Sequence, residues 1–341
     1  MVGIIEVAQR AGVSTATVSR ALNGKANVSA RARERVLKAA QELGYVASSS
    51  AYTLATGKAK NIGVVVPLID RWFFSTILEG AVNALVNRGY DVTLYSLSGG
   101  SSNRNRIFDE LVLRKRVDGV LTIALKLTEA ELQKLTELQK PIIGIGGPIP
   151  GVRAIAIDEE GAGRLATTHL ISLGHTKIGI ISGTPATEMD FHQPYLRKTG
   201  YHEALLDANL DFHPQWVAEA EFTIDGGYYA AKQMLGNPQN APTAIFCGAD
   251  EMAFGAIQAA RDLGLRVPQD ISVVGIDGHP LVEFYGLTSV NQQVKKQGVK
   301  GANELIDILE SGEDKDLRNF EDLTLWPIDL VVRSSTARQT A

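Results

Sequence analysis

The chain has 341 residues, of which 45% are hydrophobic and 33 are glycine, and this length allows a small module plus one or two α/β domains. No apolar run approaches the roughly twenty residues of a membrane span, and residues 1–12 read as an amphipathic turn of helix, not an export signal. The single cysteine, Cys247, lies in an apolar run, which predicts a buried thiol and excludes a disulfide framework. We therefore expect a cytoplasmic protein that binds no membrane.

Charge is distributed unevenly along the chain. Residues 1–58 hold eight Lys or Arg and three Glu, a balance of +5, whereas the whole chain carries −4, which leaves −9 for the rest. A basic end on an acidic body is typical of a module that neutralises DNA phosphates while the body avoids non-specific adhesion. A solvated basic helix face would explain the charges, but not their confinement to one end.

The segment AQRAGVSTATVSRALN, residues 8–23, predicts two short helices joined by a glycine turn. Gly12 supplies the left-handed turn and Ser14 an N-cap for the second helix. Apolar residues fall at helical spacing in the first helix at Ile4, Val7, Ala8 and Ala11, and in the second at Ala16, Val18 and Leu22. This pattern predicts a helix-turn-helix whose second helix enters a DNA major groove; an ordinary αα-hairpin is the alternative.

A third helix is predicted over Ala30–Leu43, introduced by Val28-Ser29 and ended by Gly44. Its apolar stripe consists of Val36, Leu37, Ala40 and Leu43. The polar stretch that follows, to Gly57, is too short for a stable isolated helix but could become helical on binding. Leu54 would then be available to wedge into a minor groove. The alternative is a flexible linker.

After Lys60 the pattern becomes that of parallel α/β structure. Continuous apolar runs predict strands covered on both faces, at Ile62–Val66, Val92–Leu97, Val117–Ile123, Ile142–Ile145, Ile155–Ile157, Ile178–Ile181, Ala244–Cys247 and Ile271–Ile276. Helical spacing is found between them at Leu78–Arg88, Glu129–Leu138, Ala162–Leu173 and Met252–Leu263. Two successive sets of such units predict two similar lobes, with a boundary near Asp158.

Polar and aromatic residues follow several of these strands, where open α/β sheets bind ligands. They are the cluster Asp70-Arg71-Trp72-Phe73-Phe74, a loop from Gly183 through Asp190, His192 and Tyr195 to Arg197, then Asp250, and Asp277-Gly278-His279. Carboxylates and an arginine can bind hydroxyls while aromatic rings stack on a ligand. Each residue could instead cap the next helix, Asp250 in particular, but together they predict one shared site.

Signatures of enzymes are absent from the sequence. Gly144–Gly147 is followed by Pro148 instead of a helix, and neither a phosphate-binding loop nor a nucleophile elbow occurs. The six histidines lack metal-ligand spacing, and His175 is interpreted as structural. We expect no catalysis, no metal and no cofactor.

The sequence closely resembles the LacI/GalR family of bacterial transcription regulators, in family order from residue 4 to about 333. The matching segments are EVAQRAGVSTATVSRALNG, VSARARERVLKAAQELGYV, IGVVVP, LISLGHTKIGIISG, RKTGYHEAL, ADEMAFGAIQAARDLGLRVPQDISVVGID and LTSVNQQ. The resemblance implies an all-α helix-turn-helix headpiece and an α/β periplasmic-binding-protein-like body of two doubly wound lobes.

The implied boundaries are a headpiece over 1–46, a hinge helix or linker over 47–60, a body over 61–333 and a tail over 334–341. Within the body, the N-lobe would comprise about 61–158 plus 291–321, and the C-lobe about 159–290 plus 322–333.

The resemblance further implies a homodimer that binds a palindromic operator in double-stranded DNA, with a small effector clasped between the lobes. A repressor released by a sugar is the default expectation. A purine-type co-repressor is the alternative, since the aromatic cluster Trp72–Phe74 could also stack on a base. A solute-binding protein and a sugar enzyme are the remaining alternatives. The binding protein would need an export signal, and the enzyme would need a set of catalytic residues.

Matching positions carry over the family's contacts. Thr15, Ala16 and Arg20 would face base edges, Leu54 would intercalate, and contacts to DNA backbone or bases would come from Ser14, Thr17, Ser19 and Asn23. The implied effector cleft is lined by Phe73, Phe74, Arg197, Phe222, Asp277 and Gln292, to which the strand-end pattern adds Asp250.

Several positions depart from the family pattern. Ala47-Ser48 replaces the usual Pro-Asn before the hinge helix, and Gly3 opens the first helix with a weaker cap. Ala249 and Gly278 each remove a hydrogen-bonding group from the cleft, which predicts an unusual ligand or fewer hydroxyl contacts. Only eight residues follow Arg333, without a leucine heptad, so we expect a dimer instead of a tetramer.

Overall fold

The computed structural model describes residues 2–22, 27–45, 58–114, 116–184, 193–311 and 323–339. The chain divides into two units, residues 1–60 and residues 61–341, which are described separately. Asn23, Leu54 and the hinge departure at Ala47-Ser48 lie outside the described residues.

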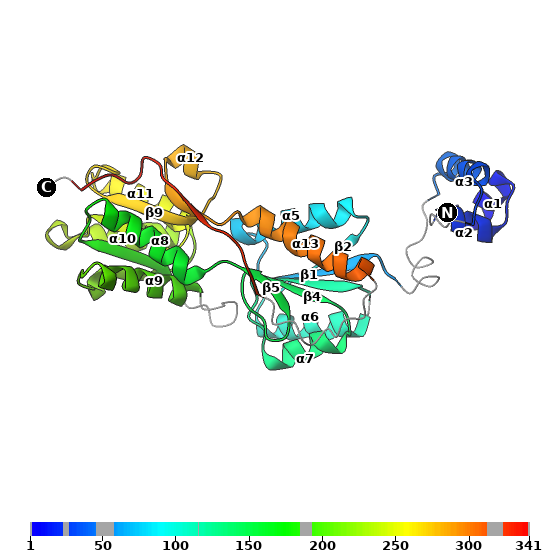
Figure 1. Cartoon of the computed structure of the whole chain (residues 1–341), viewed down its shortest axis with the longest axis horizontal. Helices are drawn as coiled ribbons and strands as arrows, with labels where there is room; N and C mark the ends of the chain where they lie inside the picture. Colours follow the sequence, from blue (N-terminus) through cyan, green and yellow to red (C-terminus); the bar gives the residue numbers. More distant parts are fainter. Residues whose placement is uncertain are drawn as a thin grey trace. The chain divides into compact units, whose positions relative to one another are not determined.

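The first unit contains three helices, α1 (Ile4–Ala11), α2 (Thr15–Leu22) and α3 (Ala30–Leu43) (Figure 1). Local signals set their ends. The Gly3 N–H donates to Glu6 Oε2 at 3.0 Å, which compensates for the missing hydroxyl cap of α1. Gly12 ends α1 at φ 63° and Gly44 ends α3 at φ 61°, both in the left-handed region that glycine adopts without strain.

Small residues build the core of the first unit, which consists of Val7, Ala8, Ala11, Val18, Ala21, Val36, Ala39 and Ala40. Two predicted core positions are wrong: Ala16 is exposed and Leu37 is 51% exposed. Ala21 and Ala39 are buried instead, since they lie three residues from Val18 and Val36 on the same helix faces. Ala16 is therefore on the outer surface of α2.

The first lobe of the body is built on a parallel sheet of order β11-β5-β4-β3-β1-β2. Its strands are β1 (Asn61–Val66), β2 (Asp91–Ser96), β3 (Gly119–Ile123), β4 (Ile142–Ile145), β5 (Arg153–Ala156) and β11 (Leu323–Leu325). One face is covered by α5 (Trp72–Asn87) and α13 (Val294–Ser311), which lie side by side (Figure 1). The other is covered by α6 (Ser101–Arg114) and α7 (Glu129–Glu137).

The second lobe repeats this arrangement in the order β12-β10-β9-β8-β6-β7. Its strands are β6 (Ile178–Gly183), β7 (Val217–Ala220), β8 (Ala244–Cys247), β9 (Ser272–Asp277), β10 (Thr288–Asn291) and the antiparallel β12 (Asp329–Val331). Helices α8 (Glu159–Ser172) and α9 (Gln193–Asp207) cover one face. The other carries α10 (Ile224–Leu235) and α11 (Asp250–Asp262), with the short α12 (Val282–Tyr285) beside them.

The predicted body of two α/β lobes is confirmed, and the chain passes from the first sheet to α8 next to Asp158. The structure adds two details to the predicted boundaries. Residues 323–325 pair with β5 in the first sheet, so the final return to the second lobe comes after Leu325 and not at 322. The predicted tail is also partly buried: Ser335 is 2% exposed, and its hydroxyl accepts from Thr288 N and donates to Val273 O.

Helix α5 is placed by a close glycine contact with α13. A Cβ at Gly298 would lie 2.1 Å from the carbonyl oxygen of Ile77, and a Cβ at Gly80 would lie 2.2 Å from that of Lys295. Only glycine allows the two backbones to approach this closely. Because α5 begins at Trp72, this contact also positions the aromatic residues of its first turn.

We expect the substitution Gly298→Ala to reduce the free energy of unfolding by about 1–3 kcal/mol, because the added methyl group forces α5 and α13 apart. Urea denaturation followed by circular dichroism measures the loss. Val299→Ala, at an exposed position of the same helix, is the control and should change stability little. Equal stabilities for the wild type and the Gly298 variant would contradict this packing.

Candidate functional site

The outer surface of α2 presents the predicted DNA-reading residues. Val18 and Ala21 face the core, whereas Ser14, Thr15, Ala16 and Arg20 are exposed and Thr17 and Ser19 are half-buried. Ser14 caps the helix as predicted, since its Oγ accepts from Thr17 N at 3.2 Å. The helix therefore offers hydroxyl groups, a methyl group and a guanidinium on one accessible surface.

Arg20 and Arg10 differ in their partners. Arg10 pairs with Glu42 at 2.7 Å, which ties α1 to α3. Arg20 is exposed and makes no ion pair with any residue that the structure describes. A guanidinium without a protein carboxylate can bind the O6 and N7 atoms of guanine in a major groove.

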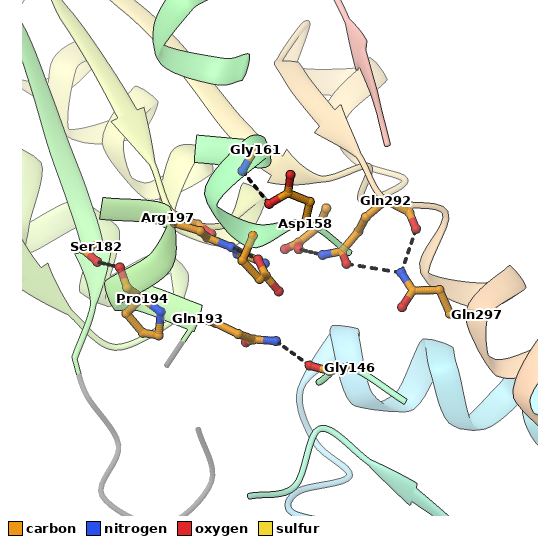
Figure 2. A network of polar contacts seen from close by, with 12 residues as sticks. Gly146, Asp158, Gly161, Ser182, Gln193, Pro194, Arg197, Gln292 and Gln297 are labelled. Carbon is orange, nitrogen blue, oxygen red and sulfur yellow. Dashed lines mark hydrogen bonds and ion pairs between the residues drawn. The ribbon is translucent and has the colours of Figure 1, made fainter. Parts of the chain in front are cut away.

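In the body, Arg197 of α9 is a buried cation whose guanidinium group is held in place by hydrogen bonds. It is 4% exposed, its Nε donates to Glu159 Oε2 at 2.6 Å, and its Nη1 donates to the carbonyl of Gly248. Glu159 opens α8 where the chain has just left β5 of the first lobe, and Gly248 follows β8, so Arg197 (labelled in Figure 2) joins the crossing between the lobes to the second sheet. The ion pair offsets part of the cost of burying both charges.

Asp277 and Gln292 form a second buried pair. The Gln292 Nε2 donates to Asp277 Oδ1 at 2.6 Å, and Gln297 Nε2 donates to the Gln292 carbonyl oxygen at 2.8 Å (Figure 2). Asp277 ends β9 with φ 139°, and Gln292 lies where the chain leaves β10 for α13. This pair therefore connects the binding edge of the second sheet with the crossing between the lobes.

Asp250 does not cap α11 as the sequence suggested. The N-cap position is Ala249, and no side chain caps this helix end. The Asp250 carboxylate is fully buried, and its Oδ2 accepts from the backbone N–H of His279 at 2.8 Å. The hydrogen-bond donor to Asp250 is therefore on the loop after β9, and not among the first N–H groups of α11.

Burial changes the acidity of both aspartates. Loss of solvation raises the pKa of Asp277 well above its ordinary value, and the neighbouring Asp250 raises it further, while Arg197 and the Gln292 amide oppose the shift. Burial likewise raises the pKa of Asp250 to about 6. These carboxylates lie within electrostatic range of Arg197 and Glu159, so the predicted acids and arginine do gather at one end of the second sheet.

The aromatic residues come from both lobes. Phe222 follows β7 and packs over the end of β6, since a Cβ at Gly183 would lie 2.2 Å from its ring. Phe73 and Phe74, in the first turn of α5, are half-buried against the core of the first lobe, with ring centroids 5.5 Å apart. No contact in the described residues joins these two rings to Phe222.

Sequence reasoning missed two residues of this region. Glu159 directly follows the predicted lobe boundary, and Gln193 Nε2 donates to the carbonyl of Gly146 in the other lobe at 3.2 Å (Figure 2). The partners of Glu159 and Gln193 are distant in sequence, so no local pattern indicated either residue. His279 was named with Asp277-Gly278, but its contacts were not.

Other predicted residues have different positions. Asp190 and His192 lie outside the described residues, and Tyr195 is largely exposed. His175 is structural, since its ring bonds Thr243 and Ser272 at 2.9 and 3.0 Å. The described residues contain no group of three or more His, Cys, Asp or Glu suited to a metal ion. Within those residues, no helix is long and apolar enough to cross a membrane.

Known proteins match both units. Residues 3–48 match the model of bacterial regulatory proteins of the lacI family, and residues 167–336 match a periplasmic binding protein-like domain. The HTH-type transcriptional repressor PurR of Vibrio vulnificus (strain CMCP6) is 36% identical over 347 residues, covering 99% of each chain.

Solved structures agree. The complex of the transcriptional regulator CelR with cellobiose is 32% identical with a TM-score of 0.70, covering 98% of this chain and 100% of that one. The lac repressor dimer bound to operator and the anti-inducer ONPF is 28% identical with a TM-score of 0.84, covering 98% and 99%.

A helix-turn-helix unit joined to a two-lobe binding body defines a class of DNA-binding transcription regulators that respond to small molecules. The relatives just described are regulators of this class and not enzymes. This chain belongs to the LacI family of bacterial regulatory proteins, and it is a DNA-binding transcriptional repressor with an effector-binding body.

The raised pKa of Asp277 predicts a pH-dependent effect of Asp277→Asn on stability. Between the ordinary carboxyl pKa and the raised one, the folded protein holds a proton that the unfolded chain lacks, so this group favours folding as pH falls. The variant removes the penalty of a buried charge. We therefore expect the stability of the variant relative to wild type to be greatest at alkaline pH, where the wild-type carboxylate is charged, and to shrink as pH falls through the raised pKa. Urea denaturation of both proteins at a series of pH values measures this difference.

Asp270→Asn is the matched control, because the ion pair with Arg266 lowers the pKa of the exposed Asp270 to about 2. Its stabilising contribution is lost only as pH falls toward that value, so the control should show no gain near neutral pH. A pH-independent difference for the Asp277 variant would contradict a buried, destabilised carboxylate.

Proposed function

We propose that this repressor binds a palindromic operator as a homodimer and is released from it by a sugar held between the lobes. The observation that carries the effector assignment is the buried set Asp277, Gln292, Arg197 and Glu159 beside the ring of Phe222. Carboxylate and amide groups bind pairs of sugar hydroxyls, and an aromatic ring packs on the C–H face of a pyranose. The cellobiose complex of CelR, a relative of 32% identity, supports a sugar.

On the DNA side, Thr15, Ala16 and Arg20 are assigned to base edges. Contacts to DNA backbone or bases are assigned to Ser14, Thr17, Ser19 and Asn23, and Leu54 is assigned to the minor groove at the operator centre. Exposure of the α2 surface supports the assignments within that helix. Asn23 and Leu54 rest on the family resemblance alone.

A homodimer is supported by exposed apolar side chains at one short helix of the second lobe. Phe284 of α12 is 85% exposed, and Leu281, the N-cap residue of the same helix, is also exposed. Large apolar groups that lie close together on a surface are typical of protein interfaces. The lac repressor structure of similar fold is a dimer bound to operator.

A purine-type co-repressor is the second candidate. The flat rings of Phe73, Phe74 and Phe222 could stack on a base, and curated relatives of 32–36% identity carry the name PurR. For this effector, DNA affinity would rise on binding instead of falling.

The substitution Arg20→Ala tests the DNA-reading surface. On duplexes selected in vitro by the wild-type protein, we expect affinity to fall about 5- to 150-fold, the equivalent of about 1–3 kcal/mol for one bidentate base contact. Affinity for random duplexes should change far less, which fluorescence anisotropy at several salt concentrations can measure. Both affinities should fall steeply with salt.

Arg10→Ala is the matched control, because it removes a cation that is already paired with Glu42 in the same unit. If Arg20→Ala kept full selectivity, or if the wild type did not bind duplex DNA, the proposed function would be wrong.

A further inference from the structure

The first turn of α5 contacts the second lobe through side chains that the effector assignment does not use. The ring of Trp72 lies against the ring of His279, with centroids 4.4 Å apart and planes tilted by 48°. Its neighbour Arg71 has a guanidinium nitrogen 3.7 Å from Glu221 Oε2. The Arg71–Glu221 pair is solvent-accessible and weak, so the ring pair is the stronger of the two contacts.

His279 is held rigidly on its own lobe. Its backbone N–H donates to Asp250 Oδ2 at 2.8 Å, and its Nδ1 accepts from Leu281 N at 3.0 Å. The ring of Phe254 packs edge-on at 5.3 Å, and only 9% of His279 is exposed. The ring of His279 is therefore held by Phe254 of α11 and by the backbone N–H of Leu281, and it also contacts the ring of Trp72.

The loop that carries His279 is equally constrained. Gly278 has φ 75°, its N–H donates to Ser289 Oγ at 3.2 Å, and a Cβ there would lie 2.4 Å from Asn291 Oδ1. A side chain at this position would push the loop away from β10. Gly278 is one of the departures from the family pattern, so this chain has a tight loop where an acidic side chain is usual.

The contact joins two neutral rings. Burial lowers the pKa of His279, and the acceptor role of Nδ1 places the ring proton on Nε2. Because the ring of Trp72 packs against His279, it is not available to stack on a ligand, whereas Phe73 and Phe74 beside it do not contact His279.

We infer that the contact between the rings of Trp72 and His279 sets the equilibrium between a closed body, in which the two lobes touch, and an open body, in which they are separated. Phe73 and Phe74 share one helical turn with Trp72, so an effector that moves this turn also moves the ring pair. The inference rests on the proposed function in one respect: the effector is taken to shift this equilibrium between the closed and the open body. A ligand shifts such an equilibrium by its difference in affinity for the two states.

Single-molecule energy transfer between the lobes of the full chain tests this inference. Glu137→Cys on α7 and Gln239→Cys after α10 introduce exposed labelling sites, while the native Cys247 is buried. Trp72→Ala and His279→Ala should each raise the ratio of separated to contacting lobes about three- to tenfold, the range for one aromatic pair. The double variant should add nothing further, and Trp72→Phe should restore part of the contact.

Phe212→Ala is the matched control, since it removes a ring that packs on the rings of Tyr201 and His202 within the second lobe. It should leave the distribution unchanged. An unchanged distribution in Trp72→Ala, or effects of the two single variants that add, would overturn the inference. If Trp72→Ala does not fold by circular dichroism, Trp72→Phe and His279→Ala decide the question. The assay contains neither DNA nor effector, so an error in the proposed function cannot produce either result.

Discussion

Burial of carboxylates at the binding edge of the second sheet is the constraint on which the body depends. A buried charge is tolerated only where it is paired or hydrogen-bonded, and its loss of solvation otherwise raises its pKa. Glu159 is paired with Arg197, Asp277 with Gln292, and Asp250 with the backbone of His279, yet burial still raises the pKa of both aspartates. Each partner lies on a different strand connection, so satisfying these acids also fixes the geometry of the site.

The same partners extend toward the other lobe. Gln292 lies at the crossing from β10 to α13, and α13 packs through Gly298 on α5. His279 meets Trp72, the first residue of α5. Two routes thus lead from the acids of the second lobe to one helix of the first, and α5 carries the aromatic residues assigned to the effector. Coupling between an effector site and a DNA-binding unit requires a structural element whose position depends on both. Helix α5 is the element of the first lobe that both chains of contacts reach.

Local signals made much of this fold predictable. Gly12, Ser29 and Gly44 end or begin helices through contacts within four residues, and continuous apolar runs such as Ile62–Val66 identify buried parallel strands. Strands β7, β10, β11 and β12 were missed. Strands β7, β11 and β12 are short and partly exposed, and β10 is buried but has Val290 as the one apolar residue among its four, so none of them shows an apolar run. The helical phase was misjudged at Ala16, a small residue, and at Leu37, which follows the buried Val36, because two adjacent apolar residues do not indicate which of them faces the core.

The candidate site was predictable by residue type but not by partner. The sequence indicated Arg197, Asp250 and Asp277 from their places after strands, and it offered a helix cap as the alternative for Asp250 because local N–H groups are the only partners visible in a sequence. The actual partner, His279, comes from the loop after another strand. The contact between the rings of Trp72 and His279 joins residues far apart in the chain, and no local pattern predicts such a contact.

The most direct test of the account is operator affinity of the full chain measured in the presence of neutral mono- and disaccharides, sugar phosphates and purines. The account predicts that a neutral sugar weakens binding about 5- to 150-fold, the usual range of allosteric coupling, and that Asp277→Asn removes this response while binding the operator normally without effector. A purine that tightens operator binding, or a sugar response that survives in Asp277→Asn, would contradict it.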